Sequence, residues 1–203
     1  VLRGMRDHEK ALAAAEEALL LVSNNSGNKL ALSEALLATG ELLAELENRD
    51  KDVVAVLQQF IQTVKKPLGV DVTWSRVNEM LGNAFFNLGQ YEHAIESYHA
   101  VLQLNPDHPW ALSFHYRIAR SYYQQRAYNE AIRTIEHMLE IASDEEQSIN
   151  DYRVYDTLGN AQFALGHYES AVRAYQIALQ MAPPNTENLH KIKSYYDLAR
   201  DRI

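Results

Sequence analysis

Two stretches of the 203-residue sequence repeat each other closely: LGNAFFNLGQYEHA at residues 81–94 and LGNAQFALGHYESA at residues 158–171. Ten of their fourteen letters are identical, and both stretches continue alike, to a tyrosine and then a proline. Self-similarity of this kind is the signature of a repeat architecture, in which each unit buries its apolar face against its neighbour. The repeated stretches therefore decide the fold class, and the rest of the chain is interpreted around them.

A third, diverged copy lies between the two. It keeps Ala119, Tyr128 and Ala131, but Arg126 stands where the other copies have a turn glycine and Ser143 where they have a proline. The three copies share the pattern L-G-x2-Y, then A-x3-F, then P, and at this point the sequence resembles the tetratricopeptide repeat (TPR) family. The copies are spaced 37 and 40 residues apart at their second-helix alanines, which is wider than a strict 34-residue repeat.

The resemblance implies an all-α fold: a right-handed superhelical solenoid of antiparallel helix pairs that ends in a C-terminal capping helix. Ala and Leu are abundant and Pro and Gly scarce, which also favours helices. The expected segments are a helix-B-like half repeat or N-terminal cap at 1–25, a degenerate lengthened helix pair at 26–66, a linker or bend at 67–74, repeats at 75–108, 112–145 and 152–185, and a capping helix at 186–203.

Each copy places a small residue where its first helix should cross its second, since only a small side chain permits a close approach. These residues are Gly82, Ala119 and Gly159. A tyrosine follows each inter-helix turn and is expected to fill the gap beside it. These residues are Tyr91, Tyr128 and Tyr168.

Composition and motifs argue against several classes of function. The net charge of −8 and the pI near 5.5 disfavour non-specific binding to nucleic acid. Cysteine is absent, so disulfides and thiolate chemistry are excluded. The sequence contains no P-loop, GxGxxG, HExxH or GxSxG motif, and its eight histidines are scattered. We expect no catalytic residue, no cofactor and no metal site, and hence a protein that is not an enzyme.

The chain starts at Val1 and shows no early apolar stretch of the signal-peptide kind. Its longest apolar run, residues 11–22, is interrupted by Glu16 and Glu17 and is too short to span a bilayer. We expect a cytoplasmic protein without direct membrane insertion, and the periplasm stays open as an alternative if a signal peptide was removed.

In TPR arrays the first helix of each pair lines the concave groove, so the resemblance implies a set of peptide-binding positions. Carried over to this sequence, they are Asn83, Phe86, Asn87, Tyr116, Arg117, Arg120, Tyr123, Gln124, Arg153, Asn160 and Phe163. Asparagine amides can donate to and accept from a peptide backbone, arginine forks suit carboxylates, and the aromatic rings can pack apolar side chains. The alternative is that the arginines pair with Glu79, Asp156 or acids that flank the helices.

Some TPR domains hold a chaperone's C-terminal carboxylate with a lysine and asparagine set. Here Glu79 stands where that clamp carries a lysine, and Thr157 replaces its second basic residue. We therefore do not expect chaperone-tail binding and favour an extended or helical peptide with acidic residues.

The leading hypothesis is a non-enzymatic adaptor that holds a segment of a protein partner in its groove, with no nucleic-acid partner. One alternative is a self-assembling scaffold that uses its convex face or the ends of the array. Another is a regulatory repeat module of a larger protein. Self-association is left open by the sequence.

Overall fold

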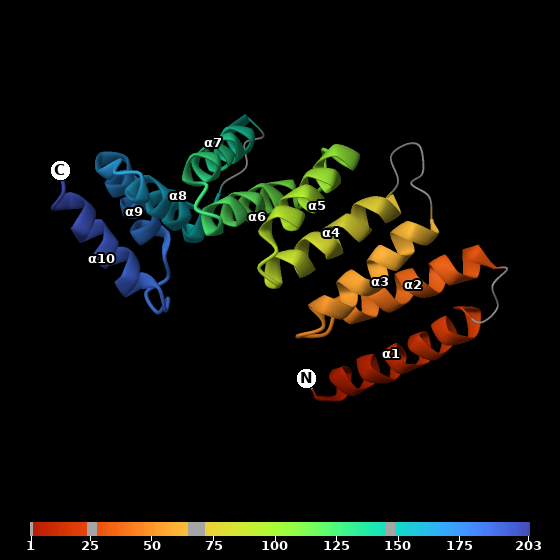
Figure 1. The fold of residues 1–203 in the computed structure, drawn as a ribbon. Helices are drawn as coiled ribbons and strands as arrows, with labels where there is room; N and C mark the ends of the chain where they lie inside the picture. Colours follow the sequence, from red (N-terminus) through yellow and green to blue (C-terminus); the bar gives the residue numbers. More distant parts are fainter. Residues whose placement is uncertain (1, 24–27, 65–71, 145–148) are drawn as a thin grey trace. The chain divides into compact units, whose positions relative to one another are not determined.

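The computed structural model describes residues 2–23, 28–64, 72–144 and 149–203, and these residues form ten α-helices and no β-strand. Figure 1 labels these helices, and their contacts divide them into two compact units, at residues 1–108 and 109–203. The all-α prediction is thus confirmed, and each unit is taken in turn.

The first unit is a run of helices in which each helix packs on the next. The helices are α1 (Leu2–Ser23), α2 (Lys29–Ala44), α3 (Asp50–Thr63), α4 (Val72–Asn87) and α5 (Tyr91–Leu104). Leu36 of α2, Leu57 of α3, Val77 of α4 and Tyr98 of α5 are fully buried between them. Most of the predicted linker at 67–74 lies outside the described residues, and its last three residues belong to α4.

The second unit is likewise a run of helices in which each helix packs on the next. Its helices are α6 (Ala111–Gln124), α7 (Tyr128–Asp144), α8 (Tyr152–Ala164), α9 (Tyr168–Met181) and α10 (Leu189–Arg200). One apolar cluster joins α6, α7 and α8, and a second joins α9 to α10. Ile192 of α10 is almost completely buried in that second cluster. The last helix therefore covers α9, as expected of a helix that caps a repeat array.

The close helix crossings occur where the sequence predicts them. A Cβ atom added to Gly82 would lie 2.7 Å from the Tyr98 ring, and one added to Gly159 would lie 2.7 Å from the Tyr175 ring. Both tyrosines are fully buried. The role predicted for the two glycines is confirmed, since any side chain there would displace a buried aromatic ring.

The turns inside the helix pairs are also built alike. Gly89 and Gly166 adopt positive φ angles of 73° and 78°, and Arg126 adopts the same left-handed conformation with a φ of 61°. Across each turn a first-helix aromatic ring meets the tyrosine that opens the second helix. The ring centroids are 5.7 Å apart for Phe86–Tyr91, 5.6 Å for Tyr123–Tyr128 and 5.4 Å for Phe163–Tyr168.

Candidate functional site

Three of the predicted groove residues belong to the first unit, on α4, and each makes a contact within that unit. The Asn83 amide oxygen accepts a hydrogen bond from the Tyr98 hydroxyl at 2.9 Å. Asn87 Nδ2 donates to Asp50 Oδ1 at 2.9 Å, and the Phe86 ring packs on Tyr91. These contacts stabilise the helix pairs, and the structure does not test a role in binding a peptide.

The second unit brings four of the predicted residues to one cavity, of about 310 Å³. They are Tyr116, Arg117, Arg120 and Arg153. The other side chains that line the cavity are Leu112, Ser113, Met138, Ile149, Asn150, Asp151 and Val154. The cavity thus lies among α6, α7 and the start of α8, and its lining combines arginines with apolar side chains.

Arg153 forms an ion pair with Asp151, the residue that caps the N-terminus of α8. The two Asp151 oxygens accept from Arg153 Nε at 2.9 and 3.0 Å, and Oδ2 accepts from Nη2 at 2.6 Å. Asp151 Oδ1 also accepts from the Arg153 backbone N–H at 3.0 Å. The sequence left open the alternative that the arginines pair with acids that flank the helices. The structure contains such a pair for Arg153.

The charges and hydrogen bonds around Asp151 stabilise the ionised form of its carboxylate. Burial by itself would raise the pKa of Asp151, but the hydrogen bonds from Arg153 and the charges of Arg153 and Arg120 outweigh it and lower that pKa. The Asp151 carboxylate therefore stays ionised beside the cavity. The same hydrogen bonds raise the pKa of Arg153, so the pair is fully charged.

Tyr116 forms an aromatic wall of the cavity. The Arg120 guanidinium carbon lies 5.9 Å from the centre of the Tyr116 ring, within the range of a cation–π contact. The Tyr116 hydroxyl lies 3.3 Å from Thr157 Oγ1 on α8. Burial raises the pKa of Tyr116, so its hydroxyl is neutral and can serve as a hydrogen-bond donor.

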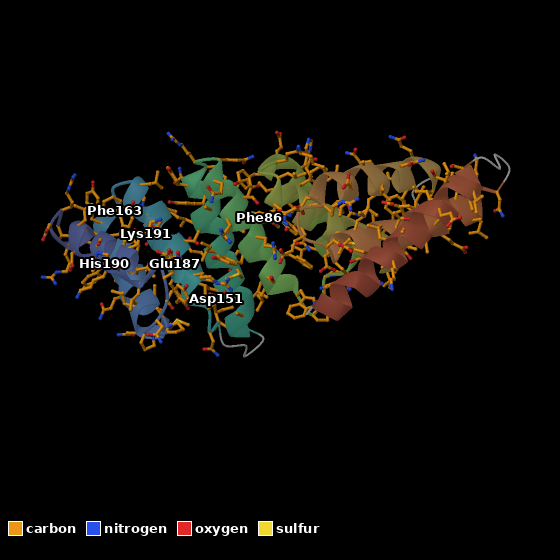
Figure 2. The ribbon with its side chains drawn as sticks, turned by 90° about the horizontal axis from the view of Figure 1, so that it is seen from below. Phe86, Asp151, Phe163, Glu187, His190 and Lys191 are labelled. Carbon is orange, nitrogen blue, oxygen red and sulfur yellow. The ribbon has the colours of Figure 1, made fainter. Side chains whose placement is uncertain are left out.

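The remaining predicted residues of the second unit lie toward the far end of α6 and α8, where Gln124 is exposed. Asn160 accepts from the Tyr175 hydroxyl at 3.0 Å and donates to Asp156 Oδ1 at 2.9 Å, and Tyr123 packs on Tyr128. Asp151 precedes α8 and Phe163 lies near its end, so the two labels in Figure 2 mark opposite ends of this helix.

Helix α10 adds two residues to this far end that the sequence interpretation missed. The Tyr195 ring lies 5.7 Å from Phe163. Burial raises the pKa of Asp156, and the charges of Lys191 and Arg120 act against that rise. Lys191 is therefore a cation of α10 close enough to α8 to interact with it. The sequence interpretation treated residues 186–203 only as a cap and therefore missed these two contacts with α8. The helical spacing of Lys191 and Tyr195 was nevertheless visible in the sequence.

The sequence interpretation also missed Asp151 and the apolar lining of the cavity. A helix N-cap signal does precede α8, because Asp151 comes just before a regular apolar pattern. The apolar lining has no local signal, since Leu112, Met138 and Ile149 come from three separate segments that only packing brings together. Among the described residues no group of three or more His, Cys, Asp or Glu side chains is placed to hold a metal ion.

Helices of the described segments are all too short or too polar to cross a membrane. No curated protein matches the sequence of the chain significantly. Family sequence models do match it: "TPR repeat" matches residues 82–125, and "Tetratricopeptide repeat" matches residues 115–148 and 152–185.

Solved structures match the fold at low sequence identity. A crystal structure of MamA is 22% identical, with a TM-score of 0.65 over 88% of this chain and 91% of that one. BtubC (BKLC) from P. vanneervenii is 16% identical, with a TM-score of 0.63 over 96% and 84%. The TPR2B domain of yeast Sti1, solved in a complex with pHsp70, is 18% identical, with a TM-score of 0.53 over 64% and 98%.

Helix pairs stacked in sequence, glycine–tyrosine crossings and left-handed turns define a helical repeat protein. The chain belongs to the tetratricopeptide repeat family, as its repeats at residues 82–185 resemble that family in sequence as well as in fold. The family is one of protein-interaction scaffolds, and its repeats are typically non-catalytic.

Proposed function

We propose that this protein is an adaptor that binds a segment of a partner protein, and that the α6–α8 cavity is the centre of its binding site. The observation that carries the proposal is the convergence of Arg117, Arg120 and Arg153 on one cavity in a chain whose net charge is −8. Arginines gathered in an acidic protein favour an anionic ligand.

The chemistry of the cavity favours a peptide with acidic residues. Guanidinium groups bind carboxylates through paired hydrogen bonds, and the Asp151–Arg153 pair shows that geometry. Tyr116 offers a ring beside the arginines, and its hydroxyl is hydrogen-bonded to Thr157. Aromatic and arginine anchors are the residues that most often dominate the binding energy of protein interfaces.

The fold comparison agrees with a protein partner and does not name one. The Sti1 TPR2B domain is described with a bound pHsp70, but that similarity is at 18% identity and concerns the fold. In this chain Glu79 lies 4.0 Å from His108 Nε2, and Thr157 lies against Tyr116. Neither residue supplies the cation that a chaperone clamp needs, so we infer a different class of ligand.

The test is affinity capture with the full chain and mass spectrometry of what is retained. We expect a partner to be retained by the wild type and lost by the variant Arg117→Glu/Arg120→Glu/Arg153→Glu. The matched control reverses the charge of three exposed arginines that belong to the same unit but do not line the cavity: Arg126→Glu/Arg133→Glu/Arg173→Glu. Circular dichroism verifies that both variants keep their helices.

The outcome is read on the difference between the two variants. A partner lost by the cavity variant and kept by the control supports the proposal, and nuclear magnetic resonance shifts on α6 and α8 then locate the contact. Equal retention by wild type and cavity variant contradicts it and moves the binding site elsewhere on the chain.

Self-association is a second candidate, because apolar side chains are exposed on the first two helices. Leu20, Leu21 and Leu30 are 62%, 66% and 69% exposed. Light scattering across a range of protein concentrations distinguishes this candidate from the first, since only self-association makes the mass rise with concentration.

A further inference from the structure

The α6–α8 cavity has both apolar and cationic side chains in its lining, and together they restrict what can occupy it. Its apolar lining is made by Leu112, Met138, Ile149 and Val154. Its cationic lining is made by Arg117, Arg120 and Arg153. A purely acidic ligand would leave the apolar surface against water, and a purely apolar ligand would remove water from the guanidinium groups.

The size of the cavity also restricts the ligand. At about 310 Å³ it lies at the small end of ligand sites, which span roughly 300–1,000 Å³. That space suits one large side chain with its immediate neighbour, and not a folded domain or a large cofactor. The ligand is thus a short element of a partner that carries an apolar group and an anion close together.

The Asp151–Arg153 pair indicates which guanidinium a carboxylate of the ligand could occupy. The Asp151 carboxylate accepts from the guanidinium and from a backbone N–H, with donor–acceptor distances of 2.6 to 3.0 Å. The side chains are nevertheless reachable, because Arg153 is 61% exposed and Asp151 33% exposed. An incoming carboxylate can therefore replace Asp151 on the same guanidinium without opening the core.

We propose that the cavity takes a large apolar side chain of the partner together with a neighbouring carboxylate, and that Asp151 holds the carboxylate's place on Arg153 until the partner binds. This inference rests on the proposed function and narrows its ligand to an acidic–apolar motif. Asp151 is then a specificity residue, since its negative charge repels the same carboxylate that the arginines attract.

The first arm of the test uses three fluorescein-labelled dodecapeptides with the 203-residue chain. All three share a Gly-Ser frame, and they differ in a central Glu-Leu-Glu, Gln-Leu-Gln or Glu-Ala-Glu. Fluorescence polarisation is expected to show that Glu-Leu-Glu binds about tenfold more tightly than either of the others. The loss of affinity with Gln-Leu-Gln measures the contribution of the arginines. The loss of affinity with Glu-Ala-Glu measures the contribution of the apolar lining.

The second arm uses variants of the cavity. Asp151→Asn keeps a good helix N-cap but removes the charge, so Glu-Leu-Glu should bind about fivefold more tightly and Gln-Leu-Gln should be unchanged. Asp197→Asn, at an exposed position of α10, removes the same charge away from the cavity and is the control, and it should change neither. Ser113→Trp, at an exposed position of the lining, should fill the cavity and abolish binding while the thermal melt stays unchanged.

Three outcomes would overturn this inference. If Glu-Ala-Glu binds as well as Glu-Leu-Glu, the cavity does not bind an apolar side chain. The binding of a carboxylate by the arginines is not contradicted by that result. Unchanged or weaker binding by Asp151→Asn shows that Asp151 is a structural cap and not a competitor. Absence of binding of all three peptides to both wild type and Asp151→Asn rejects the motif, whereas the adaptor function is judged separately by the capture experiment.

Discussion

Single residues set the distance between the helices of each pair. The rings of Tyr98 and Tyr175 pack directly against Gly82 and Gly159, and each tyrosine hydroxyl donates to the asparagine that follows the glycine. The middle repeat has Ala119 at the glycine position, with Ile135 sixteen residues later in place of the tyrosine. The larger residue on one helix is thus matched by a smaller one on the other.

This matching predicts energetic coupling between residues 159 and 175. Gly159→Ala gains up to about 1 kcal/mol of helix propensity but pushes a Cβ into the Tyr175 ring, and overpacking of this kind costs about 1–3 kcal/mol. We expect a net loss of about 1–2 kcal/mol in the free energy of unfolding, measured by urea denaturation.

The double-mutant cycle with Tyr175→Ile provides the control. In that background the ring is gone, as in the middle repeat, so Gly159→Ala should cost less than in the wild type, with a coupling of at least about 0.5 kcal/mol. An equal cost in both backgrounds would show that the ring contact does not limit the helix separation.

Elements of the fold differ in how far the sequence predicted them. The helix pairs of residues 75–185 were predicted because glycine, alanine and tyrosine recur at fixed positions, and each of these residues has a local packing role. Whether the predicted residues bind a ligand stays a prediction, and the way they are arranged was predicted only in part. Arg117, Arg120 and Arg153 do meet at one cavity, but the Asp151–Arg153 pair depends on the side-chain arrangement at the start of α8.

The asparagines show a different limit. Asn83 and Asn160 were predicted to contact a ligand, which stays a prediction, and the structure adds that their amide oxygens accept hydrogen bonds from buried tyrosines fifteen residues later. That partnership follows from the crossing of two helices, which a family-based groove assignment does not consider. The same holds for Phe86 and Phe163, whose rings pack on the tyrosine across the turn.

The α6–α7 turn supplies a prediction for a helix pair as an element. Arg126 is exposed and has a φ of 61°, a conformation that costs an L-residue about 1–2 kcal/mol and glycine almost nothing. Arg126→Gly should therefore raise the free energy of unfolding by about 0.5–1 kcal/mol after the entropy of the unfolded chain is included. Thermal and urea denaturation measure this change.

Gly166→Ala is the reverse control at the equivalent turn. Its Cβ would meet nothing within 4 Å, so any loss of stability reports the backbone conformation alone. If both Arg126→Gly and Gly166→Ala destabilise the protein, the prediction is contradicted. The Arg126 side chain must then make a contact whose stabilising energy exceeds the cost of the backbone strain.

At the scale of the whole molecule, the division at residues 108 and 109 separates two units with their own cores. All the side chains that line the α6–α8 cavity belong to residues 112–154, within the second unit. In a repeat protein each helix pair depends chiefly on its neighbours, so a cut between repeats removes one interface and leaves the other cores intact. Residues 109–203 should therefore fold alone as a helical unit with a cooperative denaturation curve.

The same fragment should bind the partner captured by the full chain with an affinity within about threefold, because it keeps every cavity residue. Circular dichroism and the polarisation assay measure the two properties on one sample. The control fragment, residues 152–203, retains α8 to α10 but loses the α6 and α7 side of the apolar cluster, and it should be less stable and should not bind. A folded 109–203 fragment that fails to bind would instead place an essential contact in the first unit, where Asn83, Phe86 and Asn87 become the residues to substitute next.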